Sequence, residues 1–182
     1  STINGDTGFS WTNAGAPYNT GLAISSDGSR FIAVRRDTVS PYNQESKVFQ
    51  INNNTVSQLG STLSGYGFAA TITYNGNYIA VSTDAGSNNA KVLKWNNNDW
   101  EIVGSEITVS TDSRYLSLSE DGTKLAISKN NRGVYTFEYD GSSWNQLDFI
   151  DTDKSYNGRA KLDASGNNII VGNPLGNSER GN

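Results

Sequence analysis

Two short apolar segments separated by a polar turn recur four times along the chain. In each copy apolar and polar positions alternate on both sides of the turn, which predicts two antiparallel strands joined as a hairpin. The copies read GLAISSDGSRFIAV (21–34), AATITYNGNYIAV (69–81), YLSLSEDGTKLAI (115–127) and AKLDASGNNIIV (160–171). The pattern therefore predicts an all-β protein built from repeats.

The turn glycines set the period of the repeat. Gly28, Gly76, Gly122 and Gly166 are 48, 46 and 44 residues apart, and counting on from Gly166 through the two termini to Gly28 gives 44 again. A period of this size is typical of solenoids, propellers and repeat arrays. The equal closing interval favours a ring and so predicts a β-propeller.

The second repeat shows the expected blade most clearly. Strand A covers 69–74 and strand B covers 78–82, and they are joined by Asn-Gly, which favours a two-residue type I′ turn. Strand C (91–95) and strand D (100–103) follow a polar loop. Four antiparallel strands in this order form a meander, which is the unit of a propeller blade.

We therefore expect a single domain over 1–182, a β-propeller of four-stranded antiparallel blades with four repeats per chain. The expected repeats are 16–65, 66–108, 109–153, and 154–182 together with 1–15. The last blade would be closed by both ends of the chain, with Ser1–Asn4 as strand C and Phe9–Gly15 as strand D, which hides strand edges that invite aggregation. Two alternatives keep the repeats: two chains forming one eight-bladed ring, and a four-repeat segment of a larger propeller.

Strand D carries a repeated motif of one bulky residue, three others and then Gly. The copies are Trp11…Gly15, Val56…Gly60 and Trp100…Gly104, with Trp144…Asp148 as the departure. A large aromatic residue that recurs at a strand start predicts a wedge between neighbouring blades.

Composition excludes several classes of protein and site. The net charge is −4, and the basic residues are scattered, which argues against a nucleic-acid partner. The chain has no His and no Cys, so imidazole and thiolate metal sites and a His-based triad are excluded. No apolar run is long enough to span a membrane. We expect no membrane insertion, no metal and no cofactor.

The repeats resemble a broad class of propeller repeats in extracellular and microbial proteins, including the FG-GAP-like repeats of integrin heads. The likeness rests on S-x-D-G between two apolar strands, V-G-N-P at 171–174, N-S-E-R-G at 177–181, and W-x3-G. The turns here are plain hairpins and lack the acidic D-x-D-x-D-G loop of the calcium-binding FG-GAP blades. The resemblance implies ligand or partner binding outside the cell.

A ring of tyrosines is the first candidate site. The residues ten positions before each turn glycine are Tyr18, Tyr66, Asp112 and Tyr156, in loops that enter strand A. Tyrosines beside polar loops offer a flat ring and a hydroxyl to a sugar or peptide. The alternative is that each ring packs between blades.

The B–C loops are the second candidate, because they differ in length on a repeating scaffold. They span 36–46, 83–89, 129–132 and 173–182. Arg36, Asp112 and Arg159 are expected to supply charged hydrogen bonds on this face. Solvated connectors without a ligand are the alternative.

Three weaker candidates remain. Lys161 and Asp163 stand on strand A where the other repeats carry small or hydroxyl residues, and they form either a ligand site or a self-neutralised pair. The acidic pairs Asp151/Asp153 and Glu120/Asp121 are possible glycosidase carboxylates or solvated turn residues, and Asp84 with Asn88 is a possible weak calcium site.

These observations favour a non-catalytic extracellular or secreted module that binds a glycan or a protein surface through its loop face. The alternative is a structural or assembly subunit, or half of an eight-bladed propeller dimer, so a homo-oligomer is possible. An enzyme is the least favoured reading, because no catalytic constellation is present in the sequence.

Overall fold

The computed structural model describes residues 21–36, 43–83, 89–109, 113–129, 133–152 and 159–172. Within these ranges the chain forms sixteen β-strands in four antiparallel sheets and no helix. The described residues accordingly offer no helix long and apolar enough to cross a membrane. The all-β prediction is confirmed.

The first two sheets are five-stranded meanders. The first contains β1 (Leu22–Ile24), β2 (Arg30–Arg36), β3 (Gln44–Asn52), β4 (Thr55–Gln58) and β5 (Leu63–Ser64). The second contains β6 (Ala69–Ile72), β7 (Tyr78–Ser82), β8 (Asn89–Trp95), β9 (Trp100–Ile102) and β10 (Ile107–Thr108). In both sheets the predicted strand D is a short strand, β4 or β9, and a further two-residue strand that was not predicted, β5 or β10, pairs with the same strand C, β3 or β8.

The last two sheets follow the same order. The third contains β11 (Ser113–Leu118), β12 (Lys124–Lys129), β13 (Val134–Tyr139) and β14 (Trp144–Ile150). The fourth is a hairpin of β15 (Arg159–Leu162) and β16 (Ile169–Gly172). The predicted strands Ser1–Asn4 and Phe9–Gly15 lie outside the described residues, so the closing of this blade by the chain ends stays a prediction.

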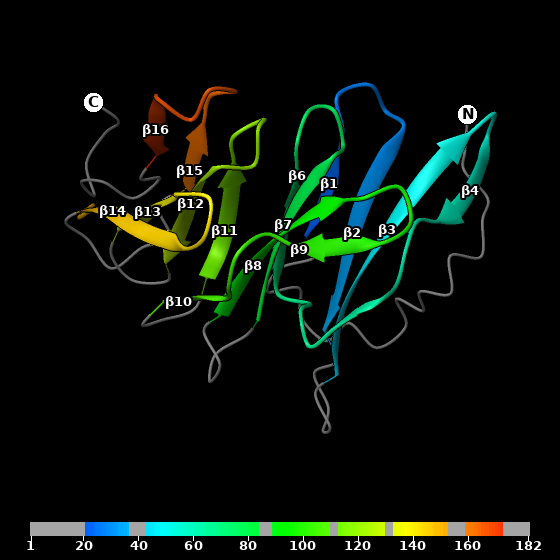
Figure 1. Ribbon diagram of the computed structural model, residues 1–182, viewed down its shortest axis with the longest axis horizontal. Helices are drawn as coiled ribbons and strands as arrows, with labels where there is room; N and C mark the ends of the chain where they lie inside the picture. The colour runs from blue at the N-terminus through cyan, green and yellow to red at the C-terminus, as the bar shows by residue number, and fades with distance from the viewer. Residues whose placement is uncertain are drawn as a thin grey trace, which may run out of the picture.

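The sheets are arranged as successive propeller blades. Strands β1 and β2 contact β6, strands β6 and β7 contact β11, and strands β11 and β12 contact β15. The A strands thus stand next to one another, and the sheets follow in order across the molecule from the blue and cyan strands to the orange ones (Figure 1). We call the end where strands A and C begin the B–C end, and the opposite end, with the turn glycines, the A–B end.

The A–B hairpins differ from the two-residue turns predicted. In the second blade the Thr73 amide donates to the Tyr78 carbonyl at 2.9 Å, so four residues form the loop. The Gly76 amide donates to the Thr73 carbonyl at 3.0 Å, and only Gly76 in this loop has a positive φ, of 69°. The loop is therefore a type I turn followed by a left-handed glycine, and the type I′ expectation is wrong here.

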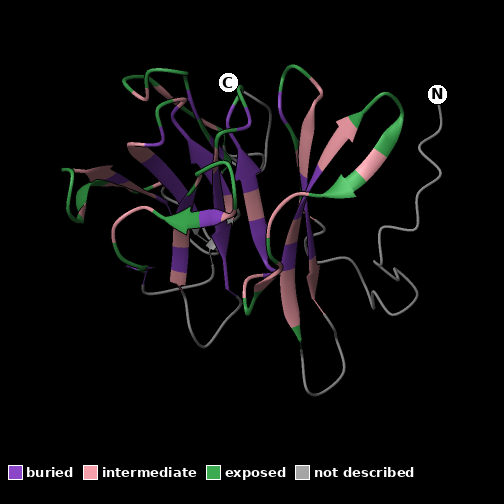
Figure 2. Ribbon diagram, turned by 45° about the vertical axis from the view of Figure 1, so that its right-hand side comes forward, coloured by how far each residue is buried: buried purple, intermediate pink, exposed green. Residues whose placement is uncertain are grey.

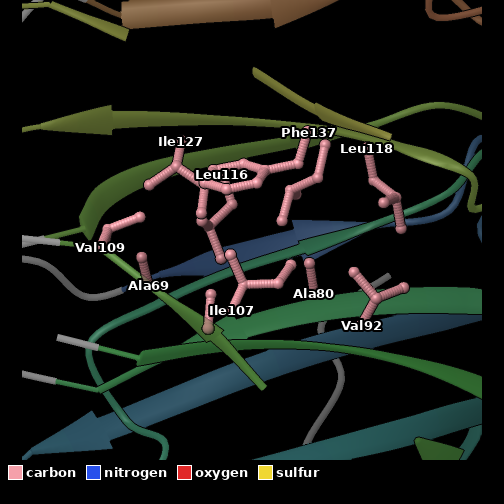
Figure 3. Packing of buried hydrophobic residues seen from close by; sticks show 11 residues of the cluster. Ala69, Ala80, Val92, Ile107, Val109, Leu116, Leu118, Ile127 and Phe137 are labelled. Carbon is pink, nitrogen blue, oxygen red and sulfur yellow. The ribbon is translucent and has the colours of Figure 1, made fainter. Parts of the chain in front are cut away.

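Apolar clusters fill the spaces between consecutive blades. The largest lies between the second and third blades and includes Val92, Ile107, Leu116, Leu125 and Phe137 (Figure 3). Buried residues accordingly gather in the middle of the molecule, whereas the outer strands are more exposed (Figure 2). The core is a series of blade–blade interfaces, which is how alternating strands bury both faces of each sheet.

The strand-D motif acts at these interfaces. Trp100 is 7% exposed, which confirms its burial, whereas Trp144 and Val56 are half-buried and Trp11 lies outside the described residues. Gly60 and Gly104 have φ values of 78° and 71°, which interrupt strand D in the first two blades. Asp148 takes the glycine position in the third blade, and β14 continues there with a bulge. Glycine accepts this conformation freely and aspartate does not.

Candidate functional site at the B–C end

The structure places three of the predicted site residues at the B–C end. Tyr66 lies just before β6, Arg36 ends β2 and Arg159 begins β15. The other three, Tyr18, Asp112 and Tyr156, lie outside the described residues. The predicted position at one common end of the strands is therefore confirmed for three of the six residues. Contact with a ligand stays a prediction for all six.

A polar cluster surrounds Tyr66. The Tyr66 hydroxyl donates a hydrogen bond to Glu106, and the Lys91 ammonium lies 3.0 Å from the same carboxylate. The Lys91 Nζ also lies 4.3 Å from the centre of the Tyr66 ring. Asn89 Nδ2 donates to Glu106 at 2.8 Å. Loop 65–67, β8 and the residue just before β10 thus bring an aromatic ring, a cation, a carboxylate and an amide together.

These contacts shift the pKa of each ionisable member. Burial, and then the bond to Glu106, raises the pKa of Tyr66. The hydrogen bond from Tyr66, and then Lys91, lowers the pKa of Glu106. Burial opposes the charge of Lys91, but its bonds to Tyr66 and Glu106 outweigh burial and raise its pKa. Glu106 is therefore ionised, Lys91 protonated and Tyr66 neutral at pH 7, a state suited to binding rather than to proton transfer.

One acceptor in the cluster has no donor among the described residues. The Asn89 Oδ1 atom is buried and receives no hydrogen bond from them. A buried acceptor without a donor is costly, by about 1–3 kcal/mol.

Two more cations at the B–C end lie over aromatic rings. The Arg36 guanidinium is 5.7 Å from the centre of the Phe68 ring. The Arg159 guanidinium is 4.7 Å from the centre of the Tyr115 ring, and its Nη2 donates to the Tyr115 hydroxyl at 3.3 Å. Each pair joins two neighbouring blades. The rings hold the cations in place by cation–π attraction.

The A–B end is occupied by contacts within and between the hairpins. The Glu120 carboxylate accepts hydrogen bonds from the amides of Tyr74 and Asn75, at 2.6 and 2.8 Å. Asp121 accepts from Ser119 and Thr123 in its own hairpin. These two acids hold hairpins together, so Glu120/Asp121 is not supported as a glycosidase pair. The Asp151/Asp153 pair stays untested. Asp153, Asp84 and Asn88 lie outside the described residues.

The Lys161–Asp163 pair also has another explanation. Asp163 accepts hydrogen bonds from Ser165, Asn167 and Asn168 in its own hairpin, the nearest from Asn168 Nδ2 at 2.8 Å. Asp163 therefore has the local role that Ser25 has in the first hairpin, where Ser25 accepts from the Arg30 amide. Elsewhere in the described part, no three His, Cys, Asp or Glu side chains gather as metal ligands.

A cavity of about 190 Å³ lies beside the last hairpin and is not a good ligand site. Its lining includes Leu125, Leu147, Asp148, Leu162 and Ile169. Between the second and third blades the matching space is filled by Phe137 and Trp144 from strands C and D. Filling of this cavity by the predicted strands C and D of the last blade, which lie outside the described residues, stays a prediction.

Sequence reasoning missed Lys91, Glu106 and Asn89. Lys91 is one of several scattered lysines, and Glu106 lies after the predicted strand D, near the end of the predicted repeat 66–108. They meet only because β10 pairs with the beginning of β8, with Ile107 opposite Ala90. No local pattern predicts a two-residue strand of this kind.

The comparisons with known proteins identify the fold. No family model and no curated protein matches the sequence. Among solved structures, a putative 6-phosphogluconolactonase from Bacteroides uniformis aligns with a TM-score of 0.58 at 16% identity, over 84% of this chain and 46% of its own. A putative 6-phosphogluconolactonase from Bacteroides fragilis aligns with a TM-score of 0.58 at 14% identity, over 84% of this chain and 41% of its own. Sqt1 from Chaetomium thermophilum aligns with a TM-score of 0.63 at 11% identity, over 84% of this chain and 40% of its own.

These neighbours confirm the β-propeller fold, and at such identities they show the fold alone. They do not bear out the narrower FG-GAP resemblance. The chain spans about half the length of the solved structures it matches or less. The number of blades in the complete ring stays open.

The expectation of a non-catalytic binding module is contradicted by the same comparison. That expectation relied on the absence of His and Cys and on the fold class. Two of the neighbours that share the fold carry the name of an enzyme. The fold therefore gives no ground for excluding catalysis, and the sequence-based conclusion was wrong.

Proposed function

We propose that this chain forms part of a propeller enzyme that hydrolyses a phosphorylated sugar lactone, with the substrate bound at the B–C end. One observation carries the proposal. Three basic side chains at that end, Arg36, Lys91 and Arg159, each lie over an aromatic ring, of Phe68, Tyr66 and Tyr115.

Cations held in this way suit a phosphate group. A guanidinium or ammonium that already lies against a ring loses less side-chain freedom when an anion arrives. The raised pKa of Lys91 keeps its charge at neutral pH. The exposed Arg159 offers the remaining N–H groups of a planar donor that matches phosphate oxygens.

The rest of the Tyr66 cluster suits a polyhydroxylated substrate. Glu106 is ionised, and its side chain is 39% exposed, so its carboxylate can accept hydrogen bonds from a ligand. Sugar hydroxyls donate to such acceptors. The names of the two Bacteroides neighbours support the substrate class, because a 6-phosphogluconolactonase acts on a phosphorylated sugar lactone.

The reaction adds one water molecule to the lactone. The water oxygen bonds to the ester carbonyl carbon, the ring C–O bond breaks, and the ring oxygen leaves as a hydroxyl, giving a hydroxy acid. The described residues bind and orient the substrate in this proposal. The group that takes the proton from water is not assigned among them, since the lowered pKa of Glu106 makes it a weak base.

The test is the hydrolysis of 6-phosphogluconolactone by the purified chain, followed by acid release against the spontaneous rate. We expect acceleration, and a KM that rises about tenfold in Lys91→Gln and in Arg159→Gln, equivalent to about 1.4 kcal/mol. The unphosphorylated lactone should show a much smaller change in KM, because it lacks the group that these cations bind.

Lys94→Gln is the matched control. Lys94 also lies over a tyrosine ring, that of Tyr78, at 5.6 Å, but it stands near the A–B end. This variant should keep the wild-type KM. No acceleration together with no calorimetric binding of 6-phosphogluconate would overturn the proposal, as would equal effects of the variants on both lactones.

The FG-GAP-like resemblance and an extracellular location remain predictions from the sequence. Neither is required for this proposal.

A further inference from the structure

The first blade leaves an interface face uncovered. Leu22 and Ile24 stand on strand A six and four residues before the turn glycine, and they are 62% and 61% exposed. Residues at the same positions in later blades pack against the preceding blade. Those at 9% exposure or less are Ile72, Leu116, Leu118, Ala160 and Leu162, while Ala70 is partly buried.

The last hairpin leaves the opposite face uncovered. Ile170 stands on strand B four residues after its turn glycine and is 77% exposed. The residues at the same position in the other blades are Ile32, Ala80 and Ala126, with exposures of 0%, 0% and 1%. Each of these three packs against the blade that follows.

The two uncovered faces are complementary. At each blade–blade interface within the described residues, the strand-B position of one blade shares an apolar cluster with the strand-A position of the next: Ile32 with Ile72, Ala80 with Leu118, and Ala126 with Leu162. Ile170 and Ile24 are the next pair in this series. A face made of Ile170 therefore fits a face made of Leu22 and Ile24.

The backbone repeats the same complementarity. The Ser26 amide donates to the Tyr74 carbonyl at 3.0 Å, and the Glu120 amide donates to the Ala164 carbonyl at 2.8 Å. Each bond joins equivalent positions in neighbouring hairpins. If the last hairpin packs against a first blade in the same way, the Ala164 amide would donate a hydrogen bond to the Ser26 carbonyl of that blade.

We propose that a second copy of this chain covers both faces, with the two copies joined head to tail. The last hairpin of each copy packs against the first blade of the other, through Ile170 and Ile24. The two contacts are identical and close the assembly, as two-fold symmetry requires. The interface continues the blade–blade packing already present in the chain, so it needs no new type of contact.

A second copy fits better than closure of one chain on itself. In a ring of one chain the last hairpin would cover Leu22 and Ile24, yet both are exposed. The first sheet and the last hairpin also lie at opposite sides of the molecule (Figure 1). Moreover, 84% of this chain aligns with only 40–46% of three propellers, so its blades are arranged as a part of a larger ring.

Native mass spectrometry with sedimentation at micromolar concentration is the first test. We expect a particle of twice the chain mass of 19.6 kDa. Ile24→Glu and Ile170→Lys should each give a monomer with unchanged far-ultraviolet circular dichroism, because both side chains are exposed. An equimolar mixture of the two variants should form dimers again, since one contact is then wild type and the other gains a Glu–Lys pair.

Ile102→Lys is the control, because Ile102 is an exposed apolar residue, at 42%, within the second blade. It should remain dimeric. A monomeric wild-type protein, a mass that grows without limit with concentration, or a mixture that stays monomeric would overturn the head-to-tail pairing.

A cysteine pair gives an independent decision, even where a charged variant fails to fold. The chain has no native cysteine, so Ile24→Cys with Ile170→Cys introduces the only two thiols. Mild oxidation should give a covalent species of two chains. A disulfide formed within one chain would instead show closure of the chain on itself and overturn the proposal.

Discussion

The indole N–H of Trp100 donates a hydrogen bond to the carbonyl oxygen of Leu59, at 2.9 Å, across the boundary between the second and first blades. The third blade repeats the contact, with Trp144 Nε1 donating to the Val103 carbonyl at 2.8 Å. Leu59 and Val103 each precede the glycine that ends the motif. The W-x3-G motif therefore acts between blades, since the tryptophan of one blade packs at the glycine of the blade before it.

Removal of this tryptophan should destabilise the fold strongly. Trp100 is 7% exposed, and Trp100→Ala should lower the free energy of unfolding by about 3–5 kcal/mol. Trp100→Phe should lose less, but it leaves the Leu59 carbonyl without its donor, at about 1–3 kcal/mol. Urea denaturation measures both. Leu147→Ala is the control, because this side chain is 56% exposed and its loss should lower the free energy of unfolding by only about 0.5 kcal/mol. An equally small loss for Trp100→Ala would contradict the packing.

The glycine of the motif should be as sensitive as the tryptophan. A Cβ at Gly60 would lie 2.6 Å from Asp99 Oδ1 and 2.8 Å from Trp100 Cδ1, and the φ of Gly60 is 78°. Gly28 has a similar φ of 71°, but a Cβ there meets nothing within 4 Å. Gly28→Ala thus measures the backbone strain alone, about 1–3 kcal/mol. Gly60→Ala should lose clearly more stability than Gly28→Ala in thermal melts, and equal losses would show that the glycine does not contact the next blade.

The hairpin carboxylates predict a loss of stability in acid. Hydrogen bonds from the Ser25 hydroxyl and then the Ser29 amide lower the pKa of Asp27 from 3.8 to about 2. A carboxyl whose pKa is lower in the folded state stabilises the fold above pH 4, and this contribution disappears as the pH falls through 2. Asp27→Asn should therefore flatten the dependence of melting temperature on pH between 4 and 2. An unchanged slope would mean that Asp27 has the same pKa folded and unfolded.

The variant should fold, because the second hairpin already contains asparagine at this position. Asn75 Oδ1 accepts from the Asn77 amide at 2.8 Å, as Asp27 Oδ1 accepts from the Ser29 amide at 2.9 Å.

Periodicity predicted the strands well because each strand alternates between two buried interfaces. Strand B of the second repeat, Tyr78–Ser82, has the bounds expected from the sequence, and strand D of that repeat begins at Trp100 as expected. The turn type was wrong at Asn75-Gly76, since Asn75 uses its side chain to cap a longer loop. Two successive positive φ values occur instead at Asn53 and Asn54, between β3 and β4.

The candidate site was only partly predictable. Spacing from the turn glycine placed Tyr66 correctly at the B–C end, because the repeat fixes where strand A begins. Its partners Lys91 and Glu106 come from strands that meet only through long-range pairing. The same limit explains why the sequence was wrongly taken to indicate a non-catalytic module. The absence of a motif concerns residues close together in the sequence, whereas a site is assembled from distant segments.

Binding at the B–C end is tested most directly by amide hydrogen exchange with and without saturating 6-phosphogluconate. Residues 65–67, 89–91, 106–108 and 159–160 should exchange more slowly in its presence, because the ligand orders the segments around Tyr66, Lys91 and Arg159. The hairpins at Gly28, Gly76 and Gly122 should exchange at unchanged rates. Slower exchange confined to those hairpins, or no change anywhere at saturating ligand, would contradict the assignment of this end as the binding site.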